Sequence, residues 1–159
     1  MKPSRIFHIS AASMLALLTA CGGGGGSGTA SVSLSGTAGK GLLIGADVKA
    51  YEVVGGKQST TPWATTTTNN VGAYELKGSP SSNPIVVVVS AKTGTEMLDE
   101  SQPQADGNFK KVPVSNLVLR SFVEKLTSND TVQVNPLTES AVAMASNAKD
   151  SSGGALGLT

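Results

Sequence analysis

The stretch Ile85–Ala91, with the sequence IVVVVSA, decides the fold because five successive positions are aliphatic and β-branched. β-Branched side chains favour extended backbone. A strand with one face in water alternates apolar and polar residues, whereas this run offers apolar side chains to both faces. The pattern therefore predicts a strand in the centre of a sheet, covered on both sides.

Alternation with a period of two extends outward from this run in both directions. Residues 45–54 (GADVKAYEVV) place Ala46, Val48 and Ala50 on one side of a strand. Residues 73–77 (AYELK) place Tyr74 and Leu76 together in the same way. Further strands are predicted in SVSLSG at 31–36, WATTTT at 63–68, LVLRSFV at 117–123 and TVQV at 131–134.

Short strands at this spacing predict an all-β fold, an antiparallel β-sandwich over residues 30–134. Two turns are predicted between these strands, GGKQ at 55–58 and NNVG at 69–72. In the second turn, the Asn69 side chain can accept a hydrogen bond from the nearby backbone and Gly72 tolerates positive φ. The alternative that these loops form a binding site stays open. We expect the core to contain Val48, Tyr74, Leu76, Val87 and Leu119.

Two segments resemble a known family. GLLIGADV at 41–48 and TNNVGAY at 68–74 are similar to the patterns of carboxypeptidase regulatory-like, or transthyretin-like, domains. The resemblance spans about residues 31–92; it lacks the frequent proline before the second leucine, and Asn69 stands where aspartate is common. It implies a transthyretin-like or immunoglobulin-like sandwich.

The N-terminal segment reads as an export signal. Lys2 and Arg5 precede the mostly apolar run IFHISAASMLALLTA at 6–20, which is short for a bilayer about 30 Å thick. A short buried helix is the structural alternative. The run ends in Leu18-Thr19-Ala20-Cys21, which resembles the lipobox of bacterial lipoproteins. The resemblance implies cleavage between Ala20 and Cys21 and a diacylglycerol on the Cys21 thiol, so residues 1–20 are the predicted signal peptide.

The residues after Cys21 predict a flexible tether over 21–29. Gly22–Gly26, Ser27 and Gly28 form a Gly/Ser chain, which behaves as a flexible coil with a span of roughly 15 Å. Since several acyl chains on one residue hold a protein to a bilayer, the domain would hang from this segment. Lipoproteins of Gram-negative bacteria are retained at the inner membrane when aspartate follows the cysteine. Gly22 at this position implies the outer membrane.

Cleavage of residues 1–20 would exclude several kinds of catalytic and metal site from the mature chain. His8 is the only histidine and Cys21 the only cysteine, so Ser-His-Asp and Cys-His catalysis, His/Cys zinc sites and a disulfide are excluded. Lys2 and Arg5 also leave, so ten Lys and Arg remain against eleven Asp and Glu. This balance gives no basic surface for nucleic acid.

The acidic loop at 98–111 and Trp63 each allow two interpretations. The acidic loop LDESQPQADGNFKK at 98–111 contains Asp99, Glu100 and Asp106, whose oxygens are possible Ca²⁺ ligands, although their spacing matches no EF-hand and an ordinary turn is favoured. Lys110 and Lys111 are expected on a solvated edge. Trp63 is a candidate sugar platform, but a place at the edge of the core is favoured.

The pattern changes to helical at Asn135. Asn135 is a candidate N-cap and Pro136 a candidate first helical residue, which predicts a short helix over 135–148 within a C-terminal segment 135–159. Its apolar face is expected to carry Leu137, Ala141, Met144, Ala145 and Ala148. Such a helix is marginal alone, so it needs either the sandwich or a further helical region as its neighbour. The further helical region is favoured.

Together these features predict a lipid-anchored, non-catalytic module of the cell envelope with a binding or structural role. Its expected partners are a membrane, through the anchor, and a protein; no catalytic residue, metal, cofactor or nucleic acid is expected. The alternative is an accessory domain of a larger envelope enzyme or transport assembly, because sandwiches of the resembling family are often appended to peptidases and outer-membrane receptors.

Overall fold

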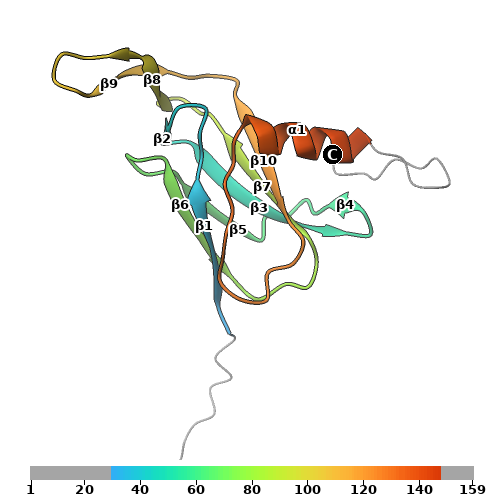
Figure 1. The fold of residues 1–159 in the computed structure, drawn as a ribbon. Helices are drawn as coiled ribbons and strands as arrows, with labels where there is room; N and C mark the ends of the chain where they lie inside the picture. The colour runs from blue at the N-terminus through green and yellow to red at the C-terminus, as the bar shows by residue number, and fades with distance from the viewer. Residues whose placement is uncertain (1–29, 148–159) are drawn as a thin grey trace, which may run out of the picture.

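A computed structural model describes residues 30–147 of the 159-residue chain. The predicted signal peptide, the motif Leu18–Cys21, the tether and the tail after Asn147 lie outside the described residues. The fold is mostly β, with one C-terminal helix (Figure 1). Its elements are β1 (Val32–Thr37), β2 (Leu43–Ile44), β3 (Asp47–Val54), β4 (Lys57–Gln58), β5 (Ala64–Thr67), β6 (Ala73–Gly78), β7 (Ile85–Ser90), β8 (Glu96–Pro103), β9 (Phe109–Pro113), β10 (Val118–Val123), β11 (Asp130–Thr131) and α1 (Pro136–Asn147).

The IVVVVSA stretch forms the central strand of the largest sheet, as predicted. β7 lies between β3 and β10 in the order β10-β7-β3-β4, and β5 also pairs with β3. Val87 stands opposite Ala50 on β3 and Ser121 on β10, and all of these pairs are antiparallel. Both faces of β7 are largely covered, because Ile85, Val86, Val87 and Val89 are all buried.

A second sheet has the order β11-β1-β6. β1 is antiparallel to β6 but parallel to β11, so the prediction of a wholly antiparallel arrangement is wrong at this pairing. The TVQV segment at 131–134 follows β1 beyond β11, since the amides of Val132 and Val134 donate to the carbonyls of Ser35 and Thr37. The six residues between β10 and β11 carry the chain from one sheet to the other, so β11 joins β1 without a hairpin turn.

One apolar core joins the two sheets. It contains residues from β1 and β6 and residues from β3, β7 and β10, together with Leu43, Leu126 and Val134. The five predicted core residues, Val48, Tyr74, Leu76, Val87 and Leu119, are all buried. Trp63 packs against this cluster at its edge and donates from Nε1 to the carbonyl of Ser79 at 2.9 Å, which supports the core-edge interpretation.

The predicted acidic loop is largely a hairpin rather than a loop. β8 and β9 pair across residues 96–113, with a register shift between Asp99 and Pro103, and β2 completes this three-stranded sheet. Residues 104–108 make the turn, where the amide of Gln104 donates to Asn108. The hairpin projects from the rest of the fold, at the end opposite to the start of β1 (Figure 1).

Candidate interaction surface on helix α1 and strand β10

The predicted lipidation site, Cys21 with the cleavage position after Ala20, lies outside the described residues. Its role therefore stays a prediction from the sequence. Within residues 30–147, no helix has the length and apolar character needed to cross a membrane.

The acidic side chains considered for Ca²⁺ bond to their own neighbours. The Asp99 carboxylate accepts from the amide and hydroxyl of Ser101 at 3.0 and 2.6 Å, and these bonds lower its pKa. Asp106 accepts in the same way from Asn108, with the same effect on its pKa. No group of three His, Cys, Asp or Glu side chains in the described part of the chain is placed to hold a metal ion.

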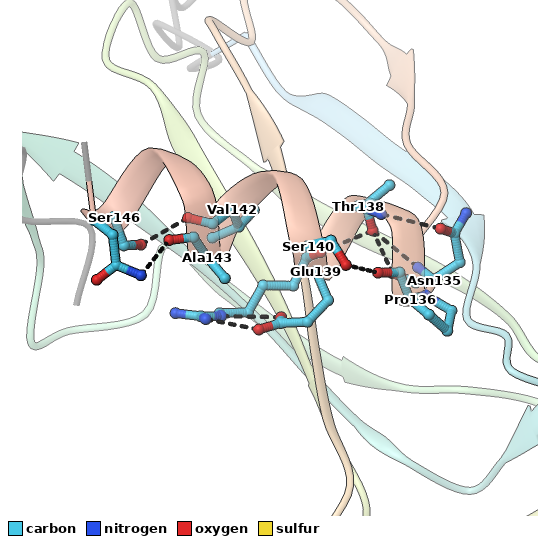
Figure 2. Close-up of polar contacts among 10 residues, drawn as sticks. Asn135, Pro136, Thr138, Glu139, Ser140, Val142, Ala143 and Ser146 are labelled. Atoms are coloured by element: carbon cyan, nitrogen blue, oxygen red, sulfur yellow. Dashed lines mark hydrogen bonds and ion pairs between the residues drawn. The ribbon is translucent and has the colours of Figure 1, made fainter.

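The cap of α1 forms as the sequence predicts (Figure 2). Asn135 Oδ1 accepts from the amides of Leu137 and Thr138 at 2.9 and 3.1 Å, and the Asn135 amide donates to Thr138 Oγ1 at 2.9 Å. Two otherwise unpaired helical donors are satisfied in this way. Pro136, which has no amide hydrogen to lose, is the first helical residue.

Polar contacts fix α1 to β10. The Arg120 guanidinium on β10 donates to both carboxylate oxygens of Glu139, from Nε at 3.0 Å and from Nη2 at 2.7 Å, and the hydrogen bond to Glu139 raises the Arg120 pKa. Thr138 Oγ1 donates to the Arg120 carbonyl at 2.8 Å. A bidentate ion pair of this kind fixes the orientation of the helix and also stabilises its contact with the strand.

The buried side of α1 differs from the predicted one. Leu137 and Met144 are 82% and 67% exposed, whereas Val142 is 3% exposed. The helix docks on the sheet, so the preference for a missing helical neighbour as its only support is wrong. Helical spacing alone allows two different faces of α1 to be buried. The Thr138 hydroxyl and the Glu139 carboxylate both bond to Arg120 on β10, and these contacts turn the face of Thr138 and Val142 toward the sheet.

An open apolar groove of about 400 Å³ runs between the helix and the strand. Its helical wall has the spacing of one helix face, three, four and seven residues apart. Phe122, 42% exposed, forms part of the other wall. The residues that line the groove are Ser121, Phe122, Thr138, Ala141, Val142 and Ala145.

A second hollow lies between the loop that follows β7 and the loop that precedes β10, and its lining is polar and apolar in about equal parts. It lies beside the ion pair of Lys92 with Asp47, and Asn116 at its rim has a φ of 59°. The hydroxyl of Thr95, a buried residue, accepts from the Lys92 amide at 2.9 Å, so this hydroxyl serves the loop itself. The groove beside α1 is the better candidate for binding, since apolar surface gains most from being covered.

The chain matches no protein-family model, no curated protein and no solved structure. The resemblance to the regulatory-like domains therefore stays an expectation from the sequence. The groove and the outward side of α1 offer surface for contact with a partner. Among the described residues that line the groove, no acid, base and nucleophile lie together. Val142 and Phe122 are not among the residues expected from the sequence, although Val142 stands four residues after Thr138 on the same helix face.

Proposed function

We propose that this protein is a lipid-anchored, non-catalytic module of the bacterial cell envelope that presents a binding surface on a β-sandwich. The observation that carries the proposal is the order of the N-terminal features. A basic and apolar leader, the motif Leu18–Cys21 and a glycine run are followed within a few residues by β1, which starts at Val32. A lipidated Cys21 would thus hold the fold close to the membrane by its first strand.

The described fold supports this arrangement. β1 starts at one end of the molecule, while the β8–β9 hairpin projects at the other (Figure 1). An anchor before β1 would therefore attach the fold to the bilayer at the end opposite to the hairpin. One core cluster takes side chains from β1 and β6 and from β3, β7 and β10, which favours a sandwich of two sheets.

Fractionation of the cell envelope tests the anchor. We expect the wild-type chain in the outer membrane and Cys21→Ser as a soluble or uncleaved protein. The control variant Cys21→Ser/Ser27→Cys keeps one thiol in the segment but moves it away from the motif, and should not restore anchoring. Cleaved Cys21→Ser protein in the outer membrane would contradict the proposal.

A second variant tests the destination of the protein. Gly22→Asp places an acid directly after the lipidated cysteine and should keep the protein at the inner membrane, with Gly23→Asp as the matched control. Equal distribution of Gly22→Asp and wild type between the membranes would show that sorting does not depend on this position.

A further inference from the structure

A hollow of about 690 Å³ lies between the β8–β9 hairpin and the turn at 69–72 that precedes β6. This hairpin hollow is lined by Asn70 from the turn and by Gln104, Asn108 and Phe109, among others, from the hairpin. Its volume is in the range of about 300–1,000 Å³ that is typical of sites for small ligands. The hairpin projects from the fold (Figure 1), and the hollow shares no lining residue with the groove beside α1.

Three side-chain amides line the hairpin hollow, and most of their hydrogen-bonding groups are unused. The side chains of Asn70 and Gln104 make no hydrogen bond to any residue in the described part of the chain. Asn108 donates from Nδ2 to the Asp106 carboxylate at 2.9 Å, which leaves its Oδ1 without a partner within residues 30–147. An amide carries both donors and an acceptor, so these side chains suit a ligand whose groups also donate and accept.

An exposed aromatic ring and a balanced charge complete the lining. Phe109 is 41% exposed, and the half-buried Leu98 adds further apolar surface to the same hollow. Lys111 is the one charged residue among the described residues of the lining, and its Nζ lies 3.7 Å from Glu96 Oε2. The hairpin hollow therefore offers a ring and several amides, with its cation already next to an acid.

We propose that the hairpin hollow binds a neutral oligosaccharide. Sugar hydroxyls both donate and accept hydrogen bonds, as the amides of Asn70, Gln104 and Asn108 do. The faces of a sugar ring carry C–H groups, which can cover the exposed ring of Phe109. An extended peptide is instead held mainly by the backbone groups of a sheet edge, whereas the polar groups of this hollow belong to side chains. The ion pair of Lys111 with Glu96 disfavours an anionic ligand.

Calorimetric titration with defined oligosaccharides tests the site. The protein is the full chain carrying Cys21→Ser, which lacks the predicted lipid site and so needs no detergent. We expect at least one of maltotetraose, cellotetraose and N-acetylchitotetraose to bind with a Kd of roughly 0.1–1 mM, because an open site leaves part of the ligand in water. If none of the three binds at concentrations up to about 10 mM, the proposal is overturned.

Variants on both sides of the hairpin hollow test whether it is the binding site. Phe109→Leu keeps an apolar side chain but removes the ring, and Asn70→Ala removes an amide from the other segment. Each should weaken binding about three- to tenfold. Phe109→Trp supplies a larger ring and should bind at least as tightly as the unaltered site. Both positions are exposed, so the unfolding midpoint in urea should not change.

The matched control is Lys110→Ala on the same strand. Lys110 is not part of the lining, and side chains alternate between the two faces along a strand, so its loss should leave the Kd unchanged. A Kd that does not respond to Phe109→Leu or to Asn70→Ala contradicts the site. An equal loss of binding in Lys110→Ala contradicts it as well.

Two further probes test the class of ligand. Tetragalacturonic acid is an anionic oligosaccharide and tetraalanine is a short peptide, and both should bind more weakly than the best neutral tetrasaccharide. Tighter binding of the acid that falls with added salt would show that Lys111 recognises charge. Tighter binding of tetraalanine would show a peptide site. Either result overturns the neutral oligosaccharide.

The anchor and the sugar site fail separately. Binding by the Cys21→Ser chain that is weakened by Phe109→Leu stands even if the wild-type chain is absent from the membrane, in which case only the proposed function fails. If the wild-type chain is found in the outer membrane but its Cys21→Ser form binds no oligosaccharide, the sugar site fails alone.

Discussion

Gly36 and Tyr74 together fix where residues 130–134 run beside β1. The Tyr74 hydroxyl on β6 reaches over β1 and donates to the Val132 carbonyl at 2.7 Å. A Cβ on Gly36 would lie 1.8 Å from that carbonyl oxygen and 2.9 Å from the Tyr74 hydroxyl oxygen. Only glycine lets the two backbones approach this closely, so one residue without a side chain decides the position of the parallel pairing.

Gly36→Ala should destabilise the fold by more than about 2 kcal/mol, because the backbone segment at Val132 must move away. The matched control is Gly39→Ala, whose added Cβ meets nothing closer than 3.6 Å and should change the unfolding free energy by less than about 1 kcal/mol. Urea unfolding compares the two variants. Equal effects would show that the segment 130–134 does not lie against Gly36.

Tyr74 should make the stability depend on pH at alkaline values. Burial raises its pKa above the ordinary value of about 10. Below pH 10 the hydroxyl is protonated in the folded and unfolded states, so its contribution is constant. Above pH 10 the unfolded state loses the proton first, and the unfolding free energy falls as pH rises. Tyr74→Phe should flatten this fall in urea melts, and an unchanged slope would contradict the burial of the hydroxyl.

At the scale of elements, α1 depends on its buried face rather than on its larger side chains. Val142→Ala removes a side chain that is 3% exposed and should cost about 1–3 kcal/mol. Met144→Ala removes a larger side chain that is 67% exposed and should change the unfolding free energy by less than about 0.5 kcal/mol. Urea unfolding followed by circular dichroism measures both. The reverse order would mean that α1 docks through its other face.

The strand β6 offers the same comparison for the core. Leu76 is buried between the sheets and Lys77 next to it is exposed. Leu76→Ala should cost about 2–5 kcal/mol, since it leaves a cavity in the core. Lys77→Ala loses only an exposed ion pair with Glu75 and should stay within about 0.5 kcal/mol of wild type. Similar small effects would mean that the faces of β6 are reversed.

The elements that the sequence predicts well are those that pack on the core. Alternation identified β3 and β6, the apolar run identified β7, and Asn135 with Pro136 identified the start of α1. The hairpin β8–β9 was missed because it projects from the core and β9 is mostly exposed, so no face has to be apolar. The docked side of α1 was missed because it is set by Arg120, a residue that lies 15 positions before the cap.

At the scale of the whole molecule, the apolar groove beside α1 is formed by two segments that are distant in the sequence rather than by a local motif. The groove joins Ser121 and Phe122 to a helix face that begins at Thr138, after β11 and the TVQV segment have passed along the other sheet. Helical periodicity pointed to α1 but not to the strand beneath it. The N-terminal motif, by contrast, is legible from four consecutive residues because an enzyme that processes it would read it before the chain folds.

The mass of the mature protein purified from the envelope tests the central claim most directly. We expect an N-terminal peptide that starts at Cys21 and carries a diacylglycerol on its thiol, with residues 1–20 absent. A mature protein whose Cys21 is an unmodified thiol, or a chain that still begins at Met1, would contradict the lipid anchor and with it the proposed place of the fold at the membrane.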